Sequence, residues 1–331
     1  MITGRVVVTG GGGFIGKALV KELVKQGGDV VVIGRNPYPD LQAMGVSCLQ
    51  GDIRDLDFLY QAFAGCGTVF HVAAKAGIWG PKKEYFAINT IGTQNVISAC
   101  LHNQVPNLIY TSTPSVVFDG EDIAGGDESL PYARNPLCHY AASKIAAEKA
   151  VLGINREQLR TVAIRPHLVW GPGDHHLIPR LLDRGREGAL KKVGSGRNLV
   201  DIAFIDNVVH VHLLAAKNLQ GEGTAVGQAF FIGQKEPVVL WKWINELFAQ
   251  MGIDPVTSRV PFPLAYIVGG CLEVAATLTG RLEEPKMTRF LAHQLAHSHW
   301  FSHGRAENIL GYKEKIASKV GMERLLAWLQ H

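Results

Sequence analysis

The sequence predicts an α/β protein whose first half forms a doubly wound parallel sheet. Short runs rich in valine and isoleucine alternate there with longer amphipathic segments, the pattern of successive strand–helix–strand units. The runs are apolar without a polar alternation, as expected for parallel strands that are buried on both faces. A Rossmann sheet with helices on both faces satisfies both observations. The second half predicts a smaller, mainly helical C-terminal substrate lobe.

The first elements set the pattern for the rest of the sheet. A strand at 5–9 leads into the glycine-rich run Gly10–Gly16, an amphipathic helix follows to about residue 26, and a second strand lies at 29–33. This order of strand, glycine turn, helix and strand is a β-α-β unit of the usual length. Further strands are expected at 46–50, 68–72, 107–112 and 161–165, with a long helix at 83–103, a polar loop at 114–136 and a helix that carries Tyr140.

The pattern loosens after Pro166. A strand is expected at 200–205, with Asp206 as the N-cap of a helix to about residue 217. Residues 229–232 form another strand that we expect to rejoin the main sheet, and mainly helical sequence follows from 238. We therefore expect a dinucleotide-binding domain of residues 1–170, to which 198–233 returns, and a substrate-binding lobe of residues 171–197 and 234–331.

Composition narrows the class of protein. The 331 residues are 47% hydrophobic and 19% charged, with a net charge of +4, which is ordinary for a globular protein and too mild and dispersed to predict nucleic-acid binding. The five cysteines are scattered, odd in number and without a C-x-x-C pair. They indicate neither a disulfide framework nor a zinc site, so we expect reduced thiols and a cytoplasmic location.

One apolar segment, residues 262–279, bears on location. Glu273 is its only charge, but the segment reaches the length of a membrane span only if Gly269, Gly270 and Glu273 are tolerated within it. We favour a helix that lines or covers an apolar pocket. Peripheral contact with a membrane is the alternative.

The glycine turn predicts dinucleotide binding. Gly10 permits the tight turn, Gly13 lets the backbone approach a pyrophosphate at the helix N-terminus, and Gly16 allows the helix to pack closely on the strand. At the end of the second strand, Arg35 stands where an acidic residue would bind the ribose 2′-hydroxyl of NAD. A guanidinium suits a 2′-phosphate, so NADP(H) is preferred and NAD(H) is the alternative. Asp52, after the third strand, is placed to meet the adenine edge or to cap its own turn.

Tyr140 and Lys144 lie four residues apart on a predicted helix, and so share one face. A phenol with a pKa of about 10 is a poor acid–base catalyst at neutral pH, and a nearby ammonium would lower that pKa toward the working range. Such a pair alone also occurs on ordinary exposed helices. Together with the glycine turn, it predicts the proton-delivery part of a hydride-transfer site.

Several motifs resemble known families. TGGGGFIG, TSTPSVV and YAASK resemble the extended short-chain dehydrogenase/reductase superfamily, and IRPHLVWGPGDHHLIPRLL is similar to the 3β-hydroxysteroid dehydrogenase family. Two branches of that family fit. AKAGIWG and TRFLAHQLAHSHWF look like bacterial 2-alkyl-3-oxoalkanoate reductases, whereas SVVFDGEDI and SLPYA also look like sterol-4α-carboxylate 3-dehydrogenases.

The resemblance implies a set of site residues. Tyr140 would be the general acid in reduction or the base in oxidation, and Lys144 would bind the nicotinamide ribose and lower the tyrosine pKa. Thr113 stands in place of the family's usual serine, with Ser112 or Ser115 able to share its role, and Asn89 would help to order the site. The resemblance also implies cofactor contacts from Phe14, Ile15, Ile53, Ala73, Ser112, Pro166 and His167.

The resemblance further implies interconversion of a ketone and a secondary alcohol on a large apolar 3-oxo or 3-hydroxy acid. A non-catalytic NADP sensor is the alternative of another class, but it has no need of Tyr140 and Lys144. A homodimer and a peripheral membrane or multi-enzyme contact are also implied. No metal is expected: His293, His297, His299 and His303 are dense, but no cysteine or carboxylate pattern completes a site.

Overall fold

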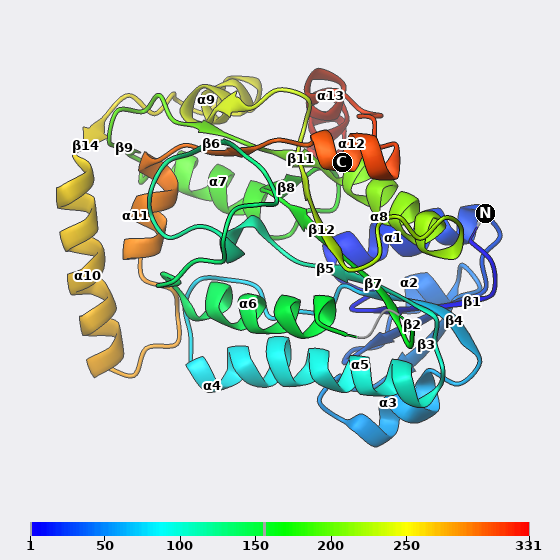
Figure 1. The fold of residues 1–331 in the computed structure, drawn as a ribbon. Helices are drawn as coiled ribbons and strands as arrows, with labels where there is room; N and C mark the ends of the chain where they lie inside the picture. Colours follow the sequence, from blue (N-terminus) through cyan, green and yellow to red (C-terminus); the bar gives the residue numbers. More distant parts are fainter. Residues whose placement is uncertain (1, 155–156, 331) are drawn as a thin grey trace.

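A parallel sheet of seven strands forms the centre of the molecule (Figure 1). The computed structural model describes residues 2–154 and 157–330. The strand order is β12-β7-β5-β4-β1-β2-β3, so the order reverses between β1 and β4, where ligands bind in sheets of this type. The strands are β1 (Arg5–Thr9), β2 (Val30–Gly34), β3 (Ser47–Gln50), β4 (Cys66–His71), β5 (Asn107–Thr111), β7 (Arg160–Pro166) and β12 (Gln228–Ile232).

Helices cover both faces of this sheet, as the apolar strands predicted. In β1, Val6 and Val8 pack toward one cluster of buried side chains, and Val7 points into another, because successive side chains of a strand face opposite sides. The first cluster contains residues of α1 (Phe14–Lys25) and α8 (Ile205–Gln220). The second contains residues of α3 (Leu56–Ala62), α5 (Gly92–His102) and α6 (His139–Leu152).

Most of the remaining elements gather beside the carboxyl ends of the strands (Figure 1). A four-stranded sheet has the order β13-β10-β15-β6, and two smaller pairs join β11 to β8 and β14 to β9. These strands are β6 (Ile123–Gly126), β8 (Val169–Trp170), β9 (Lys192–Val193), β10 (Leu199–Val200), β11 (Ala203–Phe204), β13 (Val238–Val239), β14 (Arg259–Val260) and β15 (His299–Phe301). The other helices are α2 (Pro39–Gln42), α4 (Lys82–Tyr85), α7 (Leu177–Arg186), α9 (Leu240–Gln250), α10 (Phe262–Leu278), α11 (Arg289–Ala296), α12 (Gly304–Leu310) and α13 (Ser318–Leu329).

Four sequence-based expectations need correction. The strand expected at 200–205 is two short strands, β10 and β11, which belong to different sheets. The single helix expected at 83–103 is α4, a π-helical turn (Phe86–Ile91) and α5 in succession. The expected loop at 114–136 contains a 3₁₀ turn (Pro114–Val116) and β6, which pairs with the distant β15. Asp206 is not an N-cap: α8 begins one residue earlier, with Phe204 at the cap, and the Asp206 carboxylate accepts a hydrogen bond from Arg324 at 2.8 Å.

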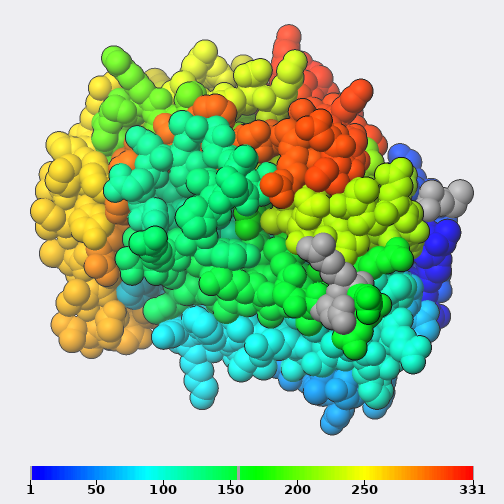
Figure 2. Space-filling view, in the orientation of Figure 1, coloured from blue at the N-terminus to red at the C-terminus, as the bar shows by residue number. Residues whose placement is uncertain are grey.

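The apolar segment is one helix, α10, at the margin of the molecule (Figure 2). Within residues 2–154 and 157–330, no helix combines the length and the apolar character that crossing a membrane requires. The helix α10 packs against α11. Gly269 allows this close contact, since a Cβ atom at that position would lie 2.7 Å from the carbonyl carbon of Thr288.

Candidate active site

A cavity of about 600 Å³ lies at the carboxyl ends of the main strands. The loops after β1, β2, β3, β4, β5 and β7 all contribute to its wall. Asn89 is not among the lining residues. The other predicted site residues all line the cavity: Gly10, Gly13, Phe14, Ile15, Gly16, Arg35, Asp52, Ile53, Ala73, Ser112, Thr113, Tyr140, Lys144, Pro166 and His167.

The glycine turn has the shape that a pyrophosphate requires. Gly10 has a φ of +71°, and a Cβ atom there would lie 2.7 Å from the Cα atom of Ala73. A Cβ atom at Gly16 would lie 2.2 Å from the carbonyl oxygen of Gly10. No side chain caps the N-terminus of α1 at Gly13, so the amide groups of its first turn are available to an anion. These residues therefore fit a dinucleotide.

The adenosine end of the cavity holds Arg35, Asp52 and one residue that the sequence did not predict. Arg35 is exposed at the end of β2. The Asp52 carboxylate accepts hydrogen bonds from the backbone (2.9 Å) and the guanidinium (2.6 Å) of Arg54, which lowers its pKa. The ring of Tyr38 lies across Gly12 and Gly34, where any Cβ atom would overlap it.

Tyr140 and Lys144 project from the first turns of α6. Burial raises the pKa of the Tyr140 phenol to about 12, although a hydrogen bond with Thr113 opposes this shift. The Lys144 ammonium is buried, donates to the carbonyl oxygen of Thr111 at 2.7 Å and lies 4.1 Å from the ring centre of Tyr110. Burial lowers its pKa to about 7. The predicted lowering of the tyrosine pKa by the lysine is therefore wrong for this structure, because burial dominates and the ammonium is bonded to backbone.

Hydroxyl groups follow β5 beside the phenol. The Thr113 and Ser115 hydroxyl oxygens are 3.2 Å apart, and the Ser115 amide donates to Thr113 Oγ1. The Ser112 hydroxyl is buried and has no hydrogen-bond partner among the described residues. A ligand that reaches Tyr140 therefore meets further hydrogen-bonding groups at the same strand end.

Asn89 lies behind the cavity wall, in the π-helical turn. Its side-chain oxygen accepts from the Lys75 amide at 2.7 Å, and its Nδ2 donates to the Lys75 carbonyl and to Ser143 Oγ, both at 3.0 Å. Ser143 Oγ in turn donates to the carbonyl oxygen of Tyr140 at 2.8 Å. Asn89 thus ties the wall at Lys75 to the helix that carries Tyr140. Single π-helical turns are frequent at functional sites.

His167 is paired with His299 of the histidine-rich motif. His167 Nε2 lies 2.6 Å from His299 Nδ1, and His299 Nε2 lies 2.9 Å from the carbonyl oxygen of Gln294. A carbonyl only accepts, so His299 Nε2 carries the hydrogen and His167 Nε2 must donate. Burial lowers the pKa of both rings. His167 therefore lines the cavity as a neutral ring, with its hydrogen on Nε2 and a lone pair on Nδ1.

The other histidines of the cluster make different contacts. His293 lies 2.8 Å from the Gly120 carbonyl and stacks on His297, with 5.1 Å between the ring centres. His303 lies 3.1 Å from the Asp201 carboxylate. Across the described part of the chain, no three histidine, cysteine or acidic side chains come together as metal ligands would.

The chain is similar to known proteins along almost its whole length. The model of the 3-beta hydroxysteroid dehydrogenase/isomerase family matches residues 7–264. The chain belongs to this family. A 2-alkyl-3-oxoalkanoate reductase of Shewanella oneidensis is 48% identical over 97% of this chain and 85% of the relative. The human sterol-4-alpha-carboxylate 3-dehydrogenase, decarboxylating, is 35% identical over 99% of this chain and 88% of the relative.

The solved structures agree with the family assignment. The structure of MoeE5 in complex with UDP-glucose and NAD is 25% identical, covers 99% of both chains and superposes with a TM-score of 0.74. This member of the 3-beta hydroxysteroid dehydrogenase/isomerase family is therefore an NAD(P)-dependent oxidoreductase with a Rossmann fold, as the glycine turn predicted.

In this dehydrogenase, the sequence-based prediction of the site missed residues that come from remote segments. Ile78 lies in the loop after β4, and Phe290 and Gln294 come from α11; all three line the cavity. The motif TRFLAHQLAHSHWF contains the last two, so its resemblance to the reductase branch was a signal that could have found them.

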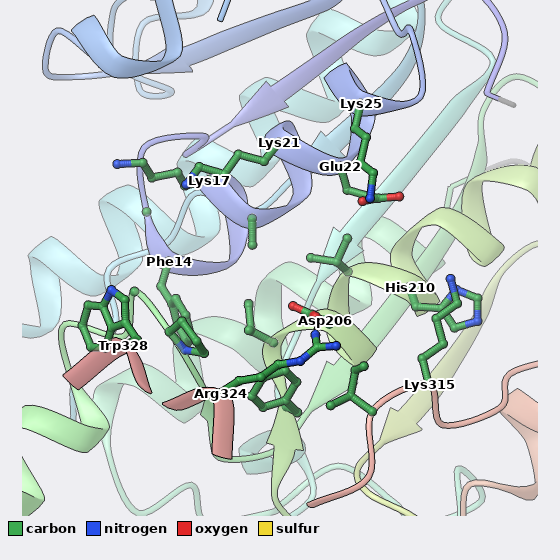
Figure 3. Close-up of a pocket in the computed structure, with 18 of the residues that line it drawn as sticks. Phe14, Lys17, Lys21, Glu22, Lys25, Asp206, His210, Lys315, Arg324 and Trp328 are labelled. Atoms are coloured by element: carbon green, nitrogen blue, oxygen red, sulfur yellow. Dashed lines mark hydrogen bonds and ion pairs between the residues drawn. The ribbon is translucent and has the colours of Figure 1, made fainter. Parts of the chain in front are cut away.

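A second cavity, of about 710 Å³, lies on the other side of the glycine turn (Figure 3). Gly13 and Phe14 line both cavities. The second one lies between α1, α8 and the region of α13, and contains neither Tyr140 nor Lys144. Its charged and aromatic residues include Lys17, Lys21, Glu22, Lys25, Asp206, His210, Lys315, Arg324 and Trp328.

Proposed function

We propose that this enzyme is an NADP(H)-dependent 2-alkyl-3-oxoalkanoate reductase that converts the 3-oxo group to a 3-hydroxyl group. One observation carries the proposal: the glycine turn, the Thr113 hydroxyl and the Tyr140–Lys144 pair all face one cavity. The relative named 2-alkyl-3-oxoalkanoate reductase, which aligns along almost the whole chain, supports the substrate class.

Tyr140 is the proton donor in this proposal. Because its pKa is about 12, the phenol is protonated at neutral pH and can deliver its proton to a ketone oxygen. The bound cofactor supplies the hydride. The Thr113 hydroxyl is hydrogen-bonded to the phenol and stabilises the substrate oxygen on which negative charge develops. In this proposal the buried Lys144 ammonium, one helical turn from Tyr140, restores the proton or binds a ribose hydroxyl.

The preference for NADP(H) rests on Arg35. The guanidinium is exposed at the end of β2 beside Tyr38, whereas an acidic residue there would repel a 2′-phosphate. The nearby carboxylate of Asp52 is held by Arg54, and so does not take the place of that acidic residue.

The segments 171–197 and 234–331 form the substrate-binding lobe in this proposal. The second candidate substrate is a 4-carboxysterol, because the human sterol dehydrogenase aligns over 99% of this chain. A panel of long-chain 2-alkyl-3-oxo acids, 4-carboxysterols and 3β-hydroxysteroids, assayed with NADPH and NADP+, tests the choice. Turnover of the sterols alone would overturn the leading proposal.

The outer surface of α10 is the candidate for peripheral contact with a lipid interface. Ile267 is 61% exposed, and Leu264, Val268 and Leu272 are also exposed on this helix; clustered apolar exposure of this kind marks interaction sites. Sedimentation with anionic vesicles tests this surface, and loss of binding is expected for Ile267→Glu. Equal sedimentation of both proteins would remove the lipid contact from the proposal.

A further inference from the structure

A third cavity, of about 580 Å³, lies between the end of α10, the loop 78–82 and the residues just before Tyr140. Trp79, Leu137, Val274, Leu278 and Leu282 give it an apolar lining. A hydrogen bond holds two of its walls together: the indole nitrogen of Trp79 donates to the carbonyl oxygen of Arg281 at 3.2 Å and so connects the loop to the end of the helix.

This cavity adjoins the candidate active site, because Ile78 and Phe290 line both spaces. Leu137 and His139 line the third cavity and come directly before Tyr140 in the chain. The apolar space therefore borders the cavity that holds the phenol, with Ile78 and Phe290 between the two.

The charges at this cavity suit an apolar chain attached to an acid. The carboxylate of Glu273 is turned to Arg289, accepting from its Nε and backbone amide at 2.7 Å each. This carboxylate is thus neutralised, while Lys82 and Arg281 line the cavity as cations.

The apolar side chains of this lining are also unusually exposed to solvent. Leu278 is 82% exposed, Leu282 73% and Val274 59%. Their contact with water is unfavourable, and a second apolar surface laid against them would remove it at about a fourfold gain in affinity per buried methylene.

We infer that the third cavity is the subsite for one of the two alkyl arms of the substrate. This inference rests on the proposed function, since a 2-alkyl-3-oxo acid carries two arms that diverge next to the reacting carbon. One arm passes between Ile78 and Phe290 and covers Val274, Leu278 and Leu282. The subsite therefore makes the enzyme selective for the length of that arm, and takes no part in the chemistry at Tyr140.

The test uses Val274→Arg, which places a cation in the subsite at an exposed helix position that folding tolerates. The matched control is Val320→Arg, which makes the same change at an exposed valine of α13, outside the cavity. With NADPH, Val274→Arg should lower kcat/KM at least tenfold for an acid with two long arms and less than twofold for one whose arms are both short. Val320→Arg should match the unsubstituted enzyme on both substrates. Equal effects of Val274→Arg on long and short acids, or no effect on either, would overturn the subsite.

A binding measurement separates this inference from the proposed function. Titration calorimetry with a long-chain 2-alkyl-3-hydroxy acid, in the presence of NADP+, needs no turnover. If the enzyme reduces no 2-alkyl-3-oxo acid, the proposed function fails, and the subsite still predicts weaker binding of this acid by Val274→Arg than by Val320→Arg. Equal binding by the two variants would refute the subsite by itself.

Discussion

The two cavities that share Gly13 and Phe14 differ in chemistry far more than in size. The one in Figure 3 is larger, at about 710 Å³ against 600 Å³, and lies among lysines, an arginine and two carboxylates. The smaller one holds a phenol, a buried ammonium and several hydroxyl groups at strand ends. The same helix serves both: α1 turns its N-terminal amides to one cavity and Lys17, Lys21 and Lys25 to the other. Chemical composition, rather than volume, therefore distinguishes the candidate active site.

The largest effect is expected at Tyr140, the proposed proton donor. Tyr140→Phe should lower turnover by about 10²–10⁴-fold, the usual contribution of a general acid, while NADPH binding measured by fluorescence stays nearly intact. Trp328→Phe, in the other cavity, is the control and should leave both quantities unchanged. Turnover by Tyr140→Phe at the normal rate would remove this tyrosine from the mechanism.

The next effect concerns the cofactor. Arg35→Asp should shift the ratio of kcat/KM for NADPH and NADH toward NADH by roughly 10–100-fold, since a charged hydrogen bond contributes about 1.5–3 kcal/mol. Lys25→Asp makes the same charge change in the other cavity and should not move the ratio. A ratio that is equal in the two variants would exclude Arg35 as the 2′-phosphate ligand.

A smaller effect is expected in the pH dependence of stability. The pKa of Lys144 is about 7 in the folded state, below its ordinary value of 10.5, so between these values the unfolded chain binds more protons. Stability must therefore rise with pH in this window, by at most about 1.4 kcal/mol per unit. Urea unfolding at pH 7 and pH 9 should show this gain in the native enzyme and a smaller one in Lys144→Met. An identical gain in both proteins would contradict a buried, titrating lysine.

The smallest effect is expected in the cavity of Figure 3. Arg324→Ala breaks the 2.8 Å pair with Asp206, in which both side chains are about half exposed. The free energy of unfolding should fall by less than about 1 kcal/mol, with turnover and NADPH affinity unchanged. A large loss of turnover would show that the two cavities are coupled through Phe14.

The main sheet was predictable because its signals are local. Apolar runs, the glycine turn and the Tyr140–Lys144 spacing each lie within a few residues, and the structure brings them to one cavity. The pairing of β6 with β15 joins residues more than 170 positions apart, and no local pattern announces it. Phe290 and Gln294 reach the cavity only through such remote packing. The direction of the Lys144 side chain was also not predictable from the sequence, because the ammonium donates to a backbone carbonyl of β5, which is remote in the chain.

The position of β12 has a consequence for synthesis of the chain. This strand completes the sheet beside β7, but residues 167–227 lie between them in the sequence. Until the ribosome has also produced β12, the polar backbone edge of β7 has no neighbour on that side, and an unpaired edge favours association with other chains. A fragment that stops after β7 would keep the glycine turn, Tyr140 and Lys144, yet it would carry a permanently open edge and a tendency to aggregate.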